Sequence, residues 1–530
     1  MRDHGGVSRK PFALAGLVAG LAGIAVSHAV TMLLTLRATP LLAVAEAVIE
    51  YTPGSIAEAL IQLVGRYDKP LLVAGVTLVV LGLSALAGVL ARRRPALGQL
   101  VFVAMGAAGF VAMWTRPGSS VYDVLPVVAG TITWLVVLSF LVDFLVDHPA
   151  PADQNPAPAD QPQADQHPAD HAPANPANPA RRGFLIRAGA VAGGALVIGV
   201  LGQFAGQARR NVETARRLLR LPVSRGFVRP GATLEVEGLE PWRTSNPDFY
   251  RIDTALVVPT VDPSEWRLRI HGMVEKEVVV SYRDLLDREL TEAWVTLCCV
   301  SNEVGGDLIG NAWWSGVRIA DLLAEAGIAP DADAVLQTSA DDWTCGTPLT
   351  ALTDGRNAML AIAMNGEPLP VEHGFPVRMV VPGLYGYVSA TKWLVDLEVT
   401  RFDRISAYWT ERGWGERGPV RTQSRIDVPR NGAEVAAGMR KIGGVAWAQQ
   451  TGLEKVEYRL DGNDWKEATL GRVPNLDTWV QWAALVDVPP GGHTLAVRAT
   501  DLSGYTQTSV RRGVVPDGAT GWHTIEFTAE

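Results

Sequence analysis

The sequence predicts three structural parts in order along its 530 residues: a membrane-embedded helical region, a mixed α+β domain and an immunoglobulin-like β-sandwich. Three observations support this division. Apolar runs long enough to cross a bilayer are confined to the N-terminal part. A tract rich in Pro and Ala, 149–180, separates most of them from the C-terminal parts. Beyond 225, short alternating segments and turn residues replace the long apolar runs, which is typical of strands and short helices.

Four N-terminal runs are apolar and about 20 residues or more in length, as a membrane span requires: Pro11–Leu36, Pro70–Ala91, Leu97–Trp114 and Val121–Val146. The stretch Leu41–Leu63 is also apolar, but three glutamates and the break at Pro53-Gly54 interrupt it. We expect that stretch to lie at the interface or against the other helices. The prediction is therefore a four-span membrane region over 1–148.

The tract 149–180 consists of Pro, Ala, Asp, Gln, Asn and His, a composition that cannot bury a core and predicts a disordered linker. We expect His167 and His171 within it to be solvated rather than bound to metal. The segment 181–206 opens with Arg181-Arg182 and continues into an Ala- and Gly-rich apolar stretch, which is typical of a twin-arginine export signal. An ordinary fifth span is the alternative, and in both cases the segment stays as an anchor.

Basic residues predict the orientation in the membrane. With five spans, the basic residues next to the spans fall on one side, which is then cytoplasmic: Arg2, Arg9, Lys10, Arg92, Arg93, Arg94, Arg181 and Arg182. The C-terminal part then lies outside, and the chain is a multi-pass protein of the cell membrane. Five arginines after the fifth span oppose this rule: Arg209, Arg210, Arg216, Arg217 and Arg220. Export of an already folded domain would tolerate them.

Composition excludes several classes of function. The net charge is −8 and no block of Lys and Arg is large enough for nucleic-acid binding. The three cysteines, Cys298, Cys299 and Cys345, cannot form a disulfide framework or a zinc site of paired Cys-x-x-Cys motifs. The sequence has no Cys-x-x-Cys-His motif for a c-type haem, and His28 and His148 are the only histidines within or next to the four apolar runs. We therefore do not expect this chain alone to bind haem.

Alternation and turn residues predict the elements of the two C-terminal parts. Within 225–417 we expect strands at 266–272, 377–381 and 392–399 and helices at 281–290 and 319–326, an α+β mixture. Within 418–530 the strand-like segments are 456–460, 479–486, 493–499 and 523–527, separated by Asp-Gly and Pro-Pro-Gly-Gly turns. That spacing predicts a β-sandwich.

One short segment carries the chemical signal. A pair of buried cysteines is by itself typical of core packing. Thr296–Asn302, however, reads Thr-Leu-Cys-Cys-Val-Ser-Asn and resembles the Thr-Leu-x-Cys-x-x-Asn segment of the sulfite oxidase family. Further segments resemble that family in the same order: Asp248–Asp253, Trp266–Gly272, Gly306–Trp314, Met364–Pro370, His373–Arg378 and Lys392–Leu394. The part 418–530 resembles, more loosely, the family's immunoglobulin-like dimerisation domain, and the first 205 residues are not covered.

The resemblance implies a Mo-molybdopterin cofactor whose molybdenum takes Cys299 as a sulfur ligand. It implies cofactor contacts from eight residues: Tyr250, Arg251, Thr338, His373, Arg378, Ala390, Thr391 and Lys392. The chemistry of these residues is suitable, because a buried phosphate needs fixed cations and hydrogen-bond donors. Arg251 and Arg512 match arginines that hold the substrate anion. A small-molecule substrate and a homodimer follow from the same resemblance. Because we do not expect this chain alone to bind haem, we expect a separate cytochrome or a quinone to accept the electrons.

The sequence departs from the family pattern at two substrate positions. Val304 stands where the family has a third arginine, and Trp414 stands where it has a tyrosine. An indole cannot donate and accept a proton as a phenol does. The resemblance therefore implies two-electron oxygen-atom transfer at molybdenum more strongly than it implies sulfite. The alternatives are a reductase of sulfoxide-type groups on the same cofactor and a non-catalytic membrane scaffold, against which the retained Cys299 argues.

Overall fold

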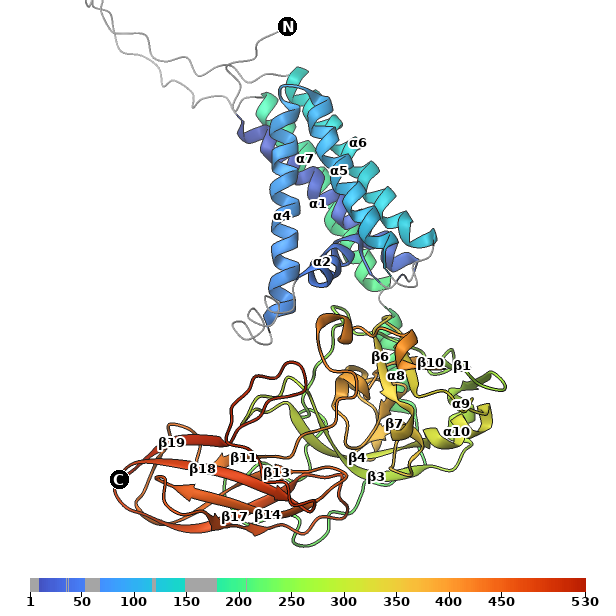
Figure 1. Ribbon diagram of the computed structural model, residues 1–530. Helices are drawn as coiled ribbons and strands as arrows, with labels where there is room; N and C mark the ends of the chain where they lie inside the picture. Colours follow the sequence, from blue (N-terminus) through green and yellow to red (C-terminus); the bar gives the residue numbers. More distant parts are fainter. Residues whose placement is uncertain are drawn as a thin grey trace, which may run out of the picture. The chain divides into compact units, whose positions relative to one another are not determined.

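The computed structural model describes residues 9–34, 36, 38–52, 67–116, 121–147, 179–205 and 207–530 (Figure 1). The predictions for His148, His167, His171 and nearly all of the linker 149–180 fall outside this part of the chain. The chain forms two compact units, Met1–Ala208 and Arg209–Glu530.

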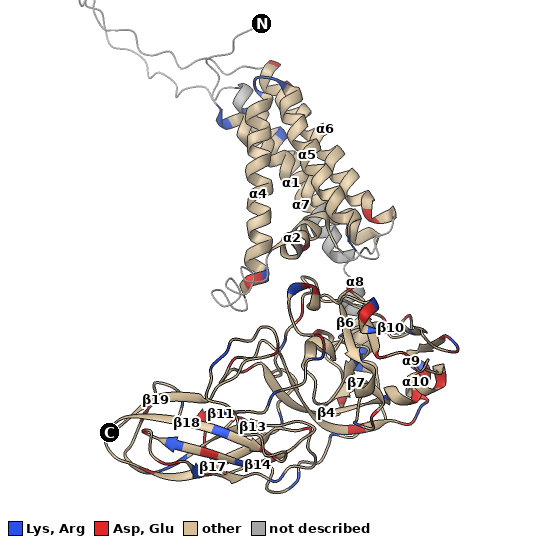
Figure 2. Cartoon of the chain, viewed as in Figure 1, with Lys and Arg blue, Asp and Glu red and all other residues tan. Residues whose placement is uncertain are grey.

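The first unit is a helical bundle. Its helices are α1 (Lys10–Leu33), α2 (Pro40–Tyr51), α4 (Asp68–Ala91), α5 (Pro95–Trp114), α6 (Leu125–Asp147), which the short η2 (Val121–Val124) precedes, and α7 (Pro179–Ala205). By length and composition, four of the described helical segments could cross a membrane, and they coincide with the four predicted runs: α1, α4, α5 and η2 with α6. Figure 2 shows charged residues gathered toward the ends of α4 and α5 rather than along them.

Small residues let helix α1 approach its neighbours closely. A Cβ atom on Gly16 of α1 would lie 2.0 Å from the carbonyl oxygen of Ser84 in α4, so the two backbones are in direct contact. Helix α1 also contacts α6, where the Trp134 indole donates a hydrogen bond of 3.0 Å to the carbonyl of Gly20. Such close approach between apolar helices is typical of packing where lipid, not water, surrounds the bundle.

Helix α7 packs in the same bundle. Its Phe184 and Ala188 are buried against Ala15 and Val18 of α1 and Leu141 of α6. The Arg187 guanidinium lies 3.9 Å from the centre of the Phe144 ring. Among the described helices, α7 is not one of those apolar enough to count as a candidate span. The fifth span therefore stays a prediction, as do the predicted domain boundaries.

The second unit begins at Arg209, within helix α8 (Gln207–Leu218). Its α+β part contains two sheets. One sheet has the order β2-β1-β10-β5-β6, with β1 (Arg267–Gly272), β2 (Val278–Ser281), β5 (Ala334–Ser339), β6 (Thr344–Pro348) and β10 (Leu394–Thr400). The other has the order β3-β4-β7-β8, with β9 beside β7; its strands are β3 (Thr291–Cys298), β4 (Ile309–Arg318), β7 (Met359–Met364), β8 (Glu367–Pro368) and β9 (Arg378–Val380).

Short helices connect these strands: α9 (Tyr282–Leu286), α10 (Ile319–Ala326), α11 (Leu349–Thr353), η3 (Val371–His373), η4 (Gly386–Val388), η5 (Phe402–Arg404) and η6 (Thr410–Arg412). The predicted α+β mixture is confirmed. The helix predicted over 281–290 is shorter than expected. Ser281 and Asp284 form its capping box, and the N–H of Asp287 closes on the carbonyls of Arg283 and Leu285, where the helix ends.

The C-terminal part is rich in β-structure, as predicted. One sheet has the order β11-β13-β17-β16, and the other has the order β12-β19-β18-β14-β15. The strands are β11 (Gln423–Val428), β12 (Glu434–Val435), β13 (Gly438–Trp447), β14 (Leu453–Leu460), β15 (Lys466–Glu467), β16 (Thr469–Leu470), β17 (Val480–Val488), β18 (Gly491–Asp501) and β19 (His523–Ala529). Both sheets contribute to one core cluster that includes Ile442, Trp482, Val497 and Phe527. The likeness to an immunoglobulin domain stays a prediction.

Candidate functional site

Cys299 is the first residue of the loop that joins β3 to β4. Its N–H donates to the carbonyl of Leu308 (2.9 Å), and the Leu308 N–H donates to the side-chain oxygen of Asn302 (2.9 Å), so the loop is closed on itself. Cys299 is buried. Burial raises the pKa of its thiol, whereas hydrogen bonds from Ser301 and, after them, the Lys392 ammonium oppose that rise. A bound metal would favour the thiolate that such a ligand must supply.

The neighbouring cysteine has a different environment. Cys298 is the last residue of β3 and belongs to the main hydrophobic core. Its thiol donates weakly to the carbonyl of Cys299 at 3.4 Å. All three cysteines are free thiols. The structure therefore separates the pair, with Cys298 in core packing at the end of β3 and Cys299 at the start of the loop.

Arg378, the first residue of β9, is a buried cation with only 4% of its surface exposed. Its guanidinium donates to the carbonyls of His373 (3.2 Å), Ala390 (3.3 Å) and Met379 (3.4 Å). Among the described residues it has no carboxylate partner. Burial lowers the pKa of Arg378 to about 10, so the group is still charged at neutral pH. A buried cation held only by carbonyls is suited to receive an anion.

A second cationic group lies close by. Lys392 and Arg251 both contact the Asp253 carboxylate, each at 2.9 Å. The Lys392 and Asp253 side chains are almost fully buried, whereas 42% of the Arg251 side chain is exposed. Burial lowers the pKa of Lys392 to about 8 despite Asp253, and the Arg378 charge lowers it further. Two cations thus share one carboxylate here, and the third, Arg378, has only carbonyl partners.

His373 lies between these groups and is neutral. Its Nε2 atom lies 3.2 Å from the carbonyl oxygen of Asn246, to which it can only donate, whereas its buried Nδ1 atom has no partner among the described residues. Burial lowers the pKa of His373 to about 3, and the charges of Lys392 and Arg378 act in the same direction. The unpaired Nδ1 is therefore free to accept a hydrogen bond from a bound molecule.

Gly374 allows the chain to turn at this point. Its φ of 109° lies outside the range of ordinary residues, and a Cβ atom there would lie 3.0 Å from Cβ of Arg378 and 3.1 Å from Cα of Lys392. The turn brings His373 and Arg378 against the segment 390–392. Thr391 in that segment is fully buried and its hydroxyl lies 3.2 Å from Sγ of Cys345.

Tyr250 joins the cluster from the segment before β1. Burial raises the pKa of its phenol, and the Cys299 and Cys298 thiols raise it further while Arg378 lowers it. A Cβ atom on Gly386 would lie 3.9 Å from the Tyr250 hydroxyl oxygen. That hydroxyl has no hydrogen-bond partner among the described residues. Tyr250 therefore presents a protonated phenol next to Cys299.

Two predicted site residues are not brought into the cluster. Thr338 lies in β5 next to Gln337, and neighbouring side chains of a strand point to opposite faces. Gln337 is buried and donates to Thr347 on the inner face, so half-buried Thr338 points the other way. Arg512 is exposed, and its backbone pairs with Thr520. In the described part of the chain no contact joins either residue to Cys299 or Arg378, and both assignments stay predictions.

Two acidic residues at or near the site were not predicted from the sequence. Asp253 ends one of the segments that resemble the family, and in the structure it is the partner of both Lys392 and Arg251. Asp341, just past β5, has a buried Oδ1 atom with no partner among the described residues. Its neighbour Ala340 donates its N–H to the carbonyl of Trp393, next to Lys392. An Asp-Asp pair in the turn after a strand is the signal that could have indicated Asp341.

The two positions that depart from the family pattern lie in ordinary packing. The Trp414 ring centre is 5.8 Å from that of Tyr387 and 6.2 Å from that of Trp409. The Tyr387 hydroxyl donates to the carbonyl of Gly415 (2.7 Å). Val304, in the Cys299 loop, is partly buried. Neither side chain carries a charge or a hydroxyl group.

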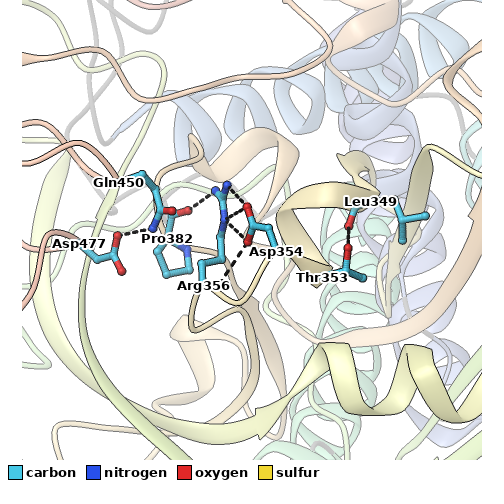
Figure 3. Close-up of polar contacts among 7 residues, drawn as sticks. All are labelled: Leu349, Thr353, Asp354, Arg356, Pro382, Gln450 and Asp477. Atoms are coloured by element: carbon cyan, nitrogen blue, oxygen red, sulfur yellow. Dashed lines mark hydrogen bonds and ion pairs between the residues drawn. The ribbon is translucent and has the colours of Figure 1, made fainter. Parts of the chain in front are cut away.

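Polar contacts fix the turn that leads from β9 to the segment 385–392. Arg356 donates to the carbonyl of Pro382 (2.8 Å) and pairs with Asp354, as Figure 3 shows. On the other side of the turn, Gln450 donates to Asp477 (2.6 Å), and a Cβ atom on Gly383 would lie 2.6 Å from the Gln450 side chain. The turn is therefore held from both sides.

The residues present fit a phosphate-bearing pterin that carries a metal. Arg378 lacks an anion, His373 lacks a donor and Asp341 lacks a donor, and each group is buried. No group of three or more His, Cys, Asp or Glu side chains in the described part of the chain could hold a metal ion alone. A metal at Cys299 would therefore take most of its ligands from another molecule, as a dithiolene-bearing pterin supplies.

Known proteins share this domain. Residues 255–409 match the family model of the oxidoreductase molybdopterin binding domain. Mitochondrial sulfite oxidase of Homo sapiens is 31% identical over 305 residues, which are 49% of this chain and 55% of the human protein. An uncharacterized oxidoreductase, YuiH, of Bacillus subtilis is 34% identical over 157 residues, which are 30% of this chain and 76% of that protein.

Among solved structures, sulfane dehydrogenase SoxCD of Paracoccus pantotrophus aligns at 23% identity with a TM-score of 0.49, over 60% of this chain and 92% of that one. The chain spans about half the length of the human sulfite oxidase that it matches.

Proposed function

The chain belongs to the sulfite oxidase family, whose domain binds Mo-molybdopterin, and on that premise we propose that it is a membrane-anchored oxidoreductase in which Cys299 ligates molybdenum. Its reaction is a two-electron oxygen-atom transfer on a small molecule. The observation that carries the proposal is that Arg378, a buried cation without a carboxylate partner among the described residues, packs with Lys392 around Gly374, while the Lys392 charge opposes the rise that burial causes in the pKa of the Cys299 thiol.

Each part of the cluster has a role toward the cofactor. Arg378 and Lys392 bind its phosphate as cations, and the Thr391 hydroxyl and nearby backbone N–H groups donate to it. Nδ1 of His373 and Oδ1 of Asp341 accept hydrogen bonds from the N–H groups of the pterin. Cys299 gives its thiolate to the metal. The cofactor supplies the two-electron redox change and the centre for oxygen transfer.

The substrate side is formed by groups that remain accessible. Arg251 is the exposed member of the Asp253 pair and can bind an anionic substrate, and Arg512 is a second exposed cation. The Tyr250 hydroxyl keeps its proton and can donate a hydrogen bond to a substrate oxygen. Val304 and Trp414 stand where the family has an arginine and a tyrosine, so this site lacks one positive charge and one phenol. Their absence favours a second candidate activity, the reduction of a neutral sulfoxide-type group.

Membrane anchoring rests on α1, α4, α5 and α6 together with α7. With α7 as a fifth span, the catalytic part lies on the extracytoplasmic side, and a cytochrome or quinone accepts or supplies electrons there. The β-rich part 418–530 occupies the same position in the sequence as the family's immunoglobulin-like dimerisation domain, which supports a homodimer.

Reporter enzymes fused after Ala150 and after Arg220 test the topology. A cytoplasmic signal at the first and an external signal at the second is expected, and signals on the same side contradict it.

Metal and cofactor analysis of the purified chain tests the proposed enzyme. We expect about one molybdenum and one pterin per chain in the wild type. Cys299→Ser should lose turnover and keep the pterin, while the matched variant of the neighbouring core cysteine, Cys298→Ser, should keep both. If wild-type protein that is produced with a supply of cofactor contains no molybdenum, the proposal is contradicted. The remaining alternative is then the non-catalytic membrane scaffold. Turnover of sulfite against methionine sulfoxide with artificial electron carriers separates the two candidate activities.

A further inference from the structure

The Cys299 loop is held from outside by the β-rich C-terminal part. The loop runs over residues 299–308, is partly exposed, and contains Glu303 and Asp307 but no cation. Its own hydrogen bonds tie its two ends together at Cys299 and Leu308. The middle of the loop, Gly305-Gly306, has little side-chain bulk with which to pack. Its position must therefore depend on what lies against it.

A buried arginine from β11 reaches this middle part. The Arg425 side chain is 8% exposed, and its Nη1 atom donates to the carbonyl of Gly306 at 3.0 Å. Its Nε atom donates to Asp427 at 2.6 Å, which fixes the guanidinium in one orientation. The indole of Trp479 lies under it, with 6.0 Å between the guanidinium carbon and the ring centre. Arg425 thus bridges β11 and the loop across 119 residues of sequence.

A histidine from β19 lies against the adjoining glycine. Nδ1 of His523 accepts a hydrogen bond of 2.9 Å from the N–H of Ile426, the residue after Arg425. A Cβ atom on Gly305 would lie 2.3 Å from the His523 ring, so the ring packs directly on the glycine backbone. Gly305 has a φ of 84°, which favours glycine there for a second reason. Burial and the charges of Arg425 and Arg511 lower the pKa of His523 to about 4, so the ring is neutral beside Arg425.

We propose that Arg425, supported by Asp427 and His523, is a positioning residue that holds the Cys299 loop in the geometry needed for metal ligation. Arg425 itself touches neither substrate nor cofactor. It acts through the Gly306 carbonyl, and therefore the C-terminal part contributes to the active site by fixing the ligand and not only by association between chains. The inference rests on the proposed function of Cys299.

The test compares matched pairs of variants in the full-length chain. Arg425→Gln removes the bridge, and Arg498→Gln is its control, because Arg498 also pairs with a carboxylate, Glu457, in the same part of the chain and does not reach the loop. Gly305→Ala pushes the loop from the His523 side. Its control is Gly504→Ala, at a glycine that also has a positive φ, 86°, but has open space around its Cβ position.

Two measurements report on the loop. The electron paramagnetic resonance signal of the molybdenum(V) state reports on ligand geometry in loaded protein. The rate at which iodoacetamide alkylates Cys299, followed by peptide mass, reports on loop order in protein produced without molybdenum. We expect Arg425→Gln and Gly305→Ala to shift the g values and to raise the alkylation rate about fivefold or more, with both controls within about twofold of wild type.

The outcomes separate the inference from the proposed function. Equal g values and equal alkylation rates for Arg425→Gln and Arg498→Gln would overturn the positioning role. If Arg425→Gln does not accumulate as folded protein, the comparison of Gly305→Ala with Gly504→Ala decides in the same way. A wild type without molybdenum would refute the proposed function, while the alkylation rates of cofactor-free protein would still decide whether Arg425 holds the loop.

Discussion

Lys392 and Asp253 form an ion pair of 2.9 Å in which both side chains are almost completely buried, 139 residues apart in sequence. A buried pair of this kind stabilises little by itself, because both charges lose their hydration. Its value here is to keep a cation charged inside the protein, where burial lowers the pKa of Lys392 to about 8. The pair therefore keeps a buried positive charge at Lys392 that can bind a second anion.

Asp253→Asn should destabilise protein that lacks cofactor by roughly 3 kcal/mol, because it leaves the Lys392 ammonium buried without its partner. The double variant Asp253→Asn/Lys392→Met should recover most of that loss, since both charges are then gone. Thermal unfolding followed by tryptophan fluorescence measures both. If the double variant is as unstable as the single one, the cost does not arise from the unpaired charge.

Arg378→Met should separate cofactor binding from stability. The variant removes a buried cation that has only carbonyl partners, so the cofactor-free protein should be as stable as wild type or more so. Pterin retained after purification should nevertheless fall at least about tenfold, because the phosphate loses a buried charge-assisted partner. Fluorescence of the released pterin gives the measurement. Full pterin content in this variant would remove Arg378 from the cofactor site.

His373→Gln should reduce the sensitivity of the cofactor-free protein to acid. The folded pKa of about 3 lies below the ordinary value of about 6.5, so as pH falls below about 6.5 the unfolded chain takes up a proton that the folded protein refuses. Between pH 7 and 5 the wild type should lose about 2 kcal/mol more stability than the variant. Glutamine keeps a donor for Asn246, and His523 titrates alike in both proteins. If the wild type and the His373→Gln variant lose the same amount of stability between pH 7 and 5, the prediction is contradicted.

Val304→Arg combined with Trp414→Tyr should shift preference toward anionic substrates. The change places an arginine five residues after Cys299 and a phenol where an indole now packs on Tyr387 and Trp409. We expect the ratio of kcat/KM for sulfite to that for methionine sulfoxide to rise about tenfold or more, an effect of about 1.4 kcal/mol on the relative barriers. An unchanged ratio would show that these two positions do not select the substrate.

Much of the fold could be predicted from local patterns. The four apolar runs coincide with described helices because the length of a membrane span is set by the bilayer and needs no tertiary contact to recognise. Four strands of the C-terminal part, β14, β17, β18 and β19, were also predicted, since alternation and turn residues are local signals, whereas β11 and β13 were not. The helix expected over 281–290 was too long, because its end depends on the cap at Asp287, which the pattern does not show.

Short motifs were enough to indicate the family, the ordered set of residues from Tyr250 to Lys392, and Cys299 as the candidate ligand, because each motif is a continuous run of residues. Which charges are compensated could be seen only in the folded chain. Folding joined Lys392 and Arg251 to Asp253, left Arg378 with carbonyls alone, and brought Arg425 to Gly306 from 119 residues away. Burial and pairing set the charge state of a site, and both arise from contacts between segments that are distant in sequence.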